Sequence, residues 1–275
     1  MSRILTLYDI EFKRIKKIYF SILGLLIISN LIWFVYNLHS VAKQVQEILN
    51  IRGGVGLFKS EEAYMIIKNG GLIYSLYVLS LFFMILALIW CLYYTLLIWY
   101  KDFSNKTKVV YTLFTLPYNK FNVFISKLIT VVSFIYGVLV TQHILWILEI
   151  FIIKSFTGIN ISEIIHIVNY NNSMSFLFMG VPIYPLEIFM YYVVGPILAV
   201  IVLFTGVLIH KSFDKLGGFL GLSYIAISAF VYMFISTTSI IFTDELLKNH
   251  FLYYIVMGGL SLIISYRLLN KRIHV

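Results

Sequence analysis

The residues able to perform acid–base or metal chemistry are few and scattered in this chain. The six histidines form no H-E-x-x-H motif, and only Glu163 with His166 has the i, i+3 spacing of two ligands on one helix. Glu61 and Glu62 are adjacent carboxylates, but no matching arginine and histidine motifs follow them. The single cysteine, Cys91, excludes an intrachain disulfide and provides no metal cluster. We therefore expect no catalytic residue, metal site or cofactor on this chain.

Three polar side chains stand inside long apolar runs, where they need a partner. They are Asn30, Gln142 and His143. Polar groups within a membrane are costly and tend to face the interior of a helix bundle or a water-filled cavity. They are therefore candidates for a translocation path. The alternative is that they form hydrogen bonds between helices, which is a common way of holding such helices together.

The stretch 101–127 is the longest polar interruption on the side that we predict to be cytoplasmic. Its apolar period predicts a helix over 105–116, with Val109, Leu113 and Leu116 on one face. The opposite face carries polar side chains, namely Lys108, Tyr111, Thr112 and Thr115. Pro117 ends this helix because it disfavours helix at the preceding residue, and Asn119 is a fair N-cap for the next one.

Composition decides the fold class that must position these residues. Of the 275 residues, 61% are hydrophobic and only 12% are charged, which predicts an all-α, polytopic membrane protein. We expect one transmembrane domain over 1–275, with no separate soluble domain. Apolar runs predict six spans, at about 19–36, 72–100, 128–153, 186–209, 217–242 and 251–269. Gly195 and Pro196 predict a kink in the fourth span.

Charge predicts the orientation and the surroundings of the chain. Residues 1–18 predict an amphipathic interfacial helix with a basic face, and they lack the features of a signal peptide. Lys and Arg in the connecting segments number 15 on the side of both termini and 101–127, against 6 on the other side. The positive side is expected to be cytoplasmic. The net charge of +9 suits contact with anionic membrane lipids, and we expect no nucleic-acid partner.

The chain resembles the ABC-2 type permease family, the membrane subunits of ATP-driven exporters. The resemblance rests on six spans, a basic N-terminal helix and the stretch DFSNKTKVVYTLFTLPYNKFNVFISK. This stretch has a charged start at Asp102, an amphipathic helix up to Leu116-Pro117, the basic Lys120 and a closing Lys127. The outer regions 37–71 and 154–185 are longer than in the plainest members of the family.

The resemblance implies that 105–116 is a coupling helix seated in a groove of an ATPase. The residues implied in coupling are Lys108, Val109, Tyr111, Thr112, Leu113, Thr115, Leu116 and Pro117. This chain has no G-x-x-x-x-G-K-[ST] phosphate loop, so ATP and Mg would bind to a separate ATPase subunit. The implied function is export of an amphipathic or hydrophobic cargo, such as a peptide, lipid-like molecule or drug, by alternating access. The permease would pair with a second copy or a paralogue.

Two other functions remain open from the sequence. The first is a membrane protein of immunity or sensing that transports nothing and docks a cytoplasmic regulator on 101–127. The second is a membrane-embedded hydrolase, for which Glu61 and Glu62 are the only suggestion. The composition, rich in Ile, Phe, Tyr, Lys and Asn, is typical of an AT-rich bacterial genome, so the expected location is a bacterial cytoplasmic membrane.

Overall fold

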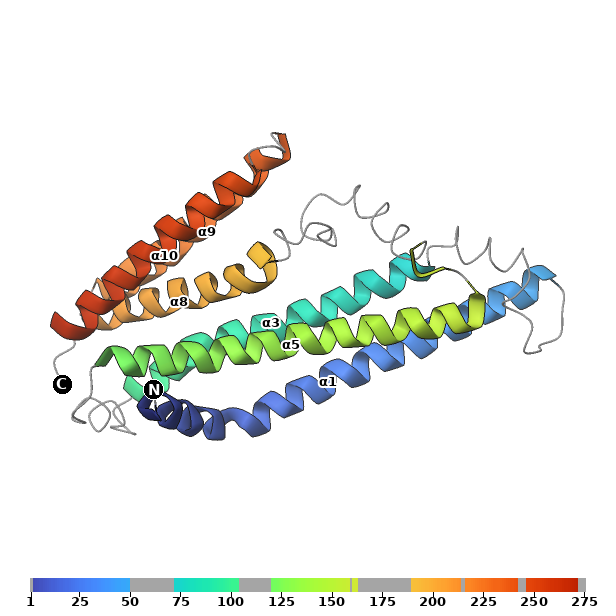
Figure 1. The fold of residues 1–275 in the computed structure, drawn as a ribbon, viewed down its shortest axis with the longest axis horizontal. Helices are drawn as coiled ribbons and strands as arrows, with labels where there is room; N and C mark the ends of the chain where they lie inside the picture. The colour runs from blue at the N-terminus through green and yellow to red at the C-terminus, as the bar shows by residue number, and fades with distance from the viewer. Residues whose placement is uncertain are drawn as a thin grey trace. The chain divides into compact units, whose positions relative to one another are not determined.

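The computed structural model describes residues 2–49, 72–103, 120–158, 160–162, 189–213, 216–241 and 246–271. The secondary structure within these ranges is entirely helical (Figure 1). The helices are α1 (Ser2–Leu49), α3 (Leu72–Phe103), α5 (Lys120–Thr157), the π-helical turn η2 (Phe189–Val194), α8 (Gly195–Ser212), α9 (Gly217–Ile241) and α10 (Leu246–Lys271). The all-α class predicted from composition is confirmed for this part of the chain.

Six of the described helices are long and apolar enough to cross a membrane. These candidate spans are Ile4–Gln44, Leu76–Phe103, Lys120–Ser155, Tyr192–Ser212, Gly217–Ser236 and Lys248–Asn270. A helix satisfies every backbone hydrogen bond within its own segment, which is why apolar runs of about 20 residues adopt it in a bilayer. The chain is therefore a multi-pass membrane protein, as its composition predicts.

Two helices extend well beyond the spans predicted from apolarity. α1 continues through the polar residues 37–49, which were assigned to an outer region, and it ends only at Leu49. α5 begins at Lys120, the residue after the predicted N-cap, and not at residue 128. Residues 2–18 are helical as the first part of α1, whereas their interfacial position stays a prediction. Hydropathy detects only the apolar part of a helix, so it does not detect a polar continuation of the same helix.

The chain divides into two compact units. One unit contains residues 1–16, 89–136 and 183–275, and the other contains 17–88 and 137–182. In the second unit, Trp146 of α5 packs on Tyr77 of α3 with ring centroids 4.9 Å apart. The Trp146 indole also donates a hydrogen bond to Ser80 Oγ at 2.6 Å. Aromatic packing and one polar contact thus join α3 to α5 within this unit.

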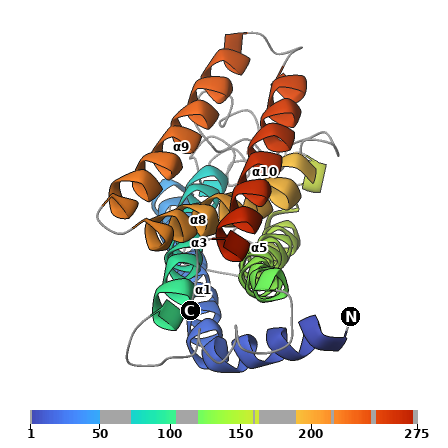
Figure 2. The same ribbon diagram turned by 90° about the vertical axis from the view of Figure 1, so that its left-hand side faces the viewer.

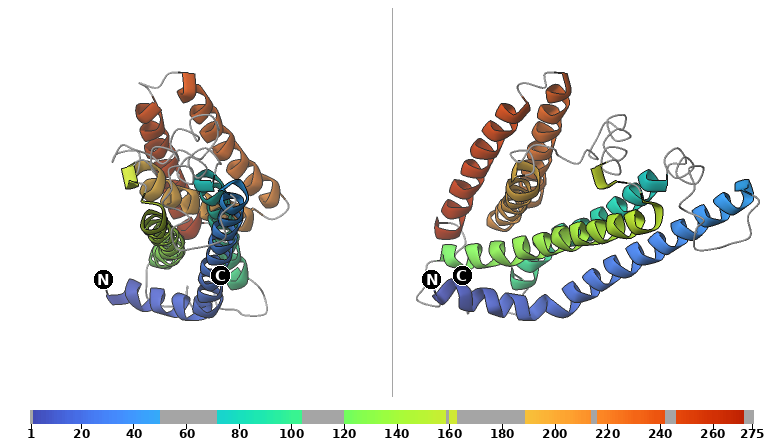
Figure 3. Two further views of the ribbon diagram at one scale, coloured as in Figure 1. Left: turned by 90° about the vertical axis from the view of Figure 1, so that its right-hand side faces the viewer. Right: turned by 45° about the vertical axis from the view of Figure 1, so that its right-hand side comes forward.

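In the first unit, α8, α9 and α10 lie side by side (Figures 2 and 3). Their shared core is apolar and aromatic, with buried residues Met190, Leu198, Val202, Tyr253 and Tyr254. The turn η2 precedes Gly195 and Pro196, where the sequence predicts a kink. Proline interrupts the regular backbone hydrogen bonds of a helix. In the η2 turn, the Val193 carbonyl accepts a hydrogen bond from the Tyr136 hydroxyl at 2.7 Å. A π-helical turn therefore lies directly before Gly195 and Pro196, and the kink itself stays a prediction.

Helices α8 and α9 cross at glycines. A Cβ atom added to Gly221 of α9 would lie 2.4 Å from the Gly206 carbonyl oxygen of α8. A Cβ added to Gly217 would lie 2.2 Å from the His210 carbonyl oxygen. Neither contact could be relieved by rotating a side chain, because each clashing atom belongs to the backbone. Gly217 and Gly221 have the G-x-x-x-G spacing, which is typical of helices that approach closely in a membrane.

We predict that Gly221→Ala destabilises the protein, because overpacking of this kind costs about 1–3 kcal/mol. Gly259→Ala on α10 is the matched control, since a Cβ at Gly259 meets no atom within 4 Å. The measurement is the denaturation midpoint of each purified variant in detergent. A Gly221→Ala protein as stable as the Gly259→Ala protein would contradict the close crossing.

Candidate functional site

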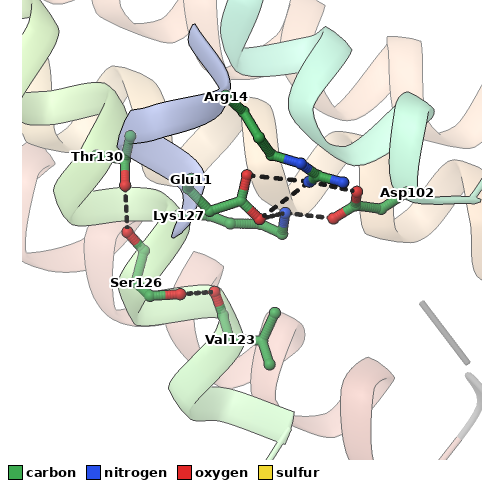
Figure 4. A network of polar contacts seen from close by, with 7 residues as sticks. All are labelled: Glu11, Arg14, Asp102, Val123, Ser126, Lys127 and Thr130. Carbon is green, nitrogen blue, oxygen red and sulfur yellow. Dashed lines mark hydrogen bonds and ion pairs between the residues drawn. The ribbon is translucent and has the colours of Figure 1, made fainter. Parts of the chain in front are cut away.

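Four charged side chains converge in the first unit and form what we call the ion cluster: Glu11, Arg14, Asp102 and Lys127 (Figure 4). Glu11 and Arg14 come from the first part of α1, one turn apart. Asp102 lies in the last turn of α3, and Lys127 lies in the second turn of α5. Three helix segments, far apart in sequence, thus meet through two positive and two negative groups.

Each cation of the ion cluster contacts both carboxylates. Lys127 Nζ donates to Glu11 Oε1 at 2.7 Å and also to Asp102 Oδ2. Arg14 Nη1 donates to Asp102 Oδ1 at 3.1 Å and lies 3.3 Å from Glu11 Oε2. The formal charges of the two cations and the two carboxylates sum to zero. Because each cation contacts both carboxylates, separating any one pair would also disturb the other two groups.

Burial makes this arrangement energetically demanding. The side chains of Lys127, Asp102 and Glu11 are 0%, 1% and 5% exposed, whereas Arg14 is 40% exposed. A buried charge is tolerated only when it is paired and hydrogen-bonded, since its loss of hydration costs several kcal/mol. Burial costs most at Lys127, because its ammonium group reaches no water. The charge of this group is tolerated there because two carboxylates contact it.

An aromatic wall borders the buried lysine. The ring of Trp99 lies 5.4 Å from Lys127 Nζ, a distance at which a cation is attracted to the face of an aromatic ring. Trp99 itself stacks on Phe103 at 5.8 Å and meets Phe204 edge to face at 5.6 Å. The wall excludes water, which strengthens every electrostatic contact inside the cluster.

The ion cluster brackets the segment 104–119. Asp102 lies two residues before this segment, and Lys127 lies in the helix that begins directly after it. Their ion pair joins residues 25 positions apart and so fixes both ends of the segment to each other. Through Glu11 and Arg14, the same contacts attach the first part of α1. A displacement of 104–119 would therefore act on three helices together.

The predicted coupling residues lie outside the described residues. This applies to Lys108, Val109, Tyr111, Thr112, Leu113, Thr115, Leu116 and Pro117, so their role stays a prediction. The paired glutamates 61–62 and the pair Glu163 and His166 also fall outside them. Within the described ranges, no three His, Cys, Asp or Glu side chains are arranged to hold a metal ion.

The structure brings together two of the three candidates for a translocation path. Asn30 Nδ2 donates to Gln142 Oε1 at 3.2 Å, and Gln142 Nε2 donates to Asn30 Oδ1 at 3.3 Å, within the second unit. Both side chains are buried. His143, half-buried, places its Nδ1 2.7 Å from the Leu139 carbonyl oxygen and its ring against Trp146. The reciprocal amide pair fits interhelical bonding, and the path itself stays a prediction.

Sequence reasoning missed Glu11 and Arg14 as members of a site. It had placed Asp102 and Lys127 in the family-like stretch, but without a contact between them. The signal for Glu11 was available: it occupies the same helix stripe as Leu7 and Ile15, which are both buried. A carboxylate within a buried stripe at i, i+4 spacing requires a cation from another segment. The identity of that cation does not follow from the pattern.

Comparisons with known proteins found no family model, no curated protein and no solved structure that matches this chain. The function must therefore be argued from the ion cluster and the helices that carry it.

We predict that Lys127→Met lowers stability by about 3–5 kcal/mol, because it leaves two buried carboxylates facing one guanidinium. The double variant Lys127→Met with Glu11→Gln keeps the Arg14–Asp102 pair and should recover part of the loss. Denaturation of the purified protein in detergent measures both. Lys154→Met, at the exposed far end of α5, is the control. A double variant no more stable than Lys127→Met alone would show that charge balance is not what the cluster requires.

We also predict that Asn30 and Gln142 are coupled in stability. Gln142→Leu or Asn30→Leu alone should cost about 0.6–1.7 kcal/mol, because each leaves the partner amide buried without its interhelical bond. Replacing both with leucine should cost less than the sum of the two single losses. A strictly additive double-mutant cycle would contradict the reciprocal pair.

Proposed function

We propose that this chain is the permease subunit of an ATP-driven ABC exporter in a bacterial cytoplasmic membrane. The observation that carries the proposal is the ion cluster, which ties both ends of the 104–119 segment to the first part of α1. An ATP-driven transport subunit without its own phosphate loop must receive work from a separate ATPase, through a segment that the ATPase contacts. A rigid attachment of that segment to several spans is the mechanical requirement for such transfer.

The proposed mechanism is alternating access. Closure of the ATPase subunits on ATP and Mg would displace the coupling helix 105–116. Because Asp102 and Lys127 are paired, α3 and α5 would move together at this end, and Glu11 and Arg14 would carry α1 with them. Packed helices respond to such a displacement as rigid bodies and not by continuous deformation. The six candidate spans provide the moving parts.

The exporter proposal also includes a class of cargo and an assembly. The family resemblance and the largely apolar composition suit an amphipathic or hydrophobic cargo, such as a peptide, a lipid-like molecule or a drug. The excess of Lys and Arg favours a cytoplasmic location for both termini and for 101–127, on the side where ATP is available. We propose two permease chains, identical or paralogous, with two ATPase subunits. This chain would carry no catalytic residue of its own.

The proposal predicts that the polar face of 105–116 contacts the ATPase. Tyr111→Ala with Thr115→Asp should leave a folded, membrane-inserted protein that no longer co-purifies with the ATPase or stimulates its ATP hydrolysis. Tyrosine is a frequent anchor of interfaces, so its loss should weaken binding by more than tenfold. The matched control is Tyr93→Ala, which removes an exposed tyrosine from α3.

The partner to test is any phosphate-loop ATPase that a neighbouring reading frame encodes. Undiminished co-purification and ATP turnover in the double variant would remove this face from the coupling interface. A loss caused instead by Val109→Asp alone would assign docking to the apolar stripe. If no phosphate-loop ATPase binds the wild-type chain, the exporter proposal fails, and the immunity or sensor function becomes the better explanation.

A further inference from the structure

Helices α8, α9 and α10 line an open apolar groove of about 410 Å³. Its walls are Ile209 and Phe213 of α8, Leu220, Ser223, Tyr224 and Ile227 of α9, and Ile264 and Leu268 of α10. The volume lies within the range of roughly 300–1,000 Å³ that is typical of small-molecule sites. All of these residues belong to one compact unit.

The walls of the groove are held by hydrogen bonds between the three helices. The Tyr224 hydroxyl lies 2.6 Å from Ser261 Oγ and so links α9 to α10. Thr205 Oγ1 lies 2.9 Å from Ser265 Oγ and links α8 to α10. The glycine crossing of Gly206 and Gly221 fixes α8 against α9. The groove is therefore a preformed feature, and an occupant need not open it.

The chemistry of the groove selects a hydrocarbon occupant. Its only polar wall residues are Ser223 and Tyr224, and both hydroxyls are already engaged. Ser223 Oγ donates to the Leu220 carbonyl at 3.0 Å, and Tyr224 contacts Ser261. Every wall residue except Phe213 belongs to a candidate membrane span. A flexible acyl chain from the surrounding bilayer fits such walls, whereas a polar ligand would find no free donor.

Positive charge lies at the end of the groove. Arg267 directly precedes the wall residue Leu268 and follows Ile264 by one helical turn, so it stands on the same side of α10. Its side chain is exposed and forms no ion pair with a described residue. Lys211, which is exposed in the last turn of α8 and lies two positions before the wall residue Phe213, adds a second positive charge. This charge is complementary to an anionic lipid headgroup.

We propose that this groove is a binding site for an anionic phospholipid, with an acyl chain between α8, α9 and α10 and the headgroup phosphate at Arg267. The inference does not depend on the exporter proposal, because the groove belongs to the chain alone. The proposal predicts that the groove binds anionic lipids in preference to others. A hydrophobic surface without the charge would bind whichever lipid is present.

The test is native mass spectrometry of the purified full chain with phosphatidylglycerol or phosphatidylcholine of identical acyl chains. Wild-type protein should retain phosphatidylglycerol preferentially. Arg267→Gln should lower that retention about fivefold, the effect of one basic residue near the headgroup. The control is Lys248→Gln, which removes an exposed charge from the opposite end of α10 and should change nothing.

A second pair of variants tests the acyl site itself. Ser223→Phe fills the groove and should lower retention of both lipids, whereas Ala229→Phe on the other side of α9 should not. Ile227→Trp, at a wall position that is 62% exposed, serves the same purpose if Ser223→Phe misfolds.

Three outcomes would overturn the proposal. Equal retention of the two lipids with no effect of Arg267→Gln would remove the headgroup site. Loss on Arg267→Gln with no effect of either groove-filling variant would mean that the charge acts at the surface and that the groove is not the site. A change in the dimer fraction on Ser223→Phe, with lipid retention unchanged, would show that a second copy of this chain covers the groove.

Discussion

The constraint on which the first unit depends is the ammonium group of Lys127, which is buried with no access to water. A charge in that position must be neutralised by groups held within hydrogen-bond distance. Asp102 and Glu11 meet this need, and Arg14 in turn balances the surplus negative charge. The last turn of α3, the second turn of α5 and the first part of α1 are therefore fixed relative to one another by charge balance and not only by shape.

The contacts among α8, α9 and α10 follow a different principle. These helices approach one another at Gly206 and Gly221 and exchange hydroxyl contacts through Thr205 and Tyr224. In apolar surroundings, burial of side chains gives little net attraction between helices, so close backbone approach and short hydrogen bonds take over. One region of the unit thus relies on charge and another on small residues.

The sequence predicts the helices better than it predicts their partners. Six apolar runs of 18 residues or more are enough to predict six spans, because lipid permits little else. The end of α1 at Leu49 escapes this reasoning, since polar residues can extend a helix beyond the bilayer, whereas the start of α5 at Lys120 agrees with the predicted N-cap Asn119. Asn30 and Gln142 were each recognised as needing a partner, but a sequence does not say that they satisfy one another. The sequence does not predict the ion cluster either, because two of its pairs join residues that are 88 and 116 positions apart.

That separation along the chain has a consequence for biogenesis. Glu11 and Arg14 leave the ribosome first, and they can neutralise one another only partly, as an i, i+3 pair on one helix. Their remaining partners are synthesised much later, Asp102 at the end of α3 and Lys127 within α5. Until Lys127 has emerged, the first part of α1 cannot adopt its final buried position without leaving a carboxylate uncompensated. The first part of α1 can therefore reach its final position only after α3 and the first two turns of α5 have been translated.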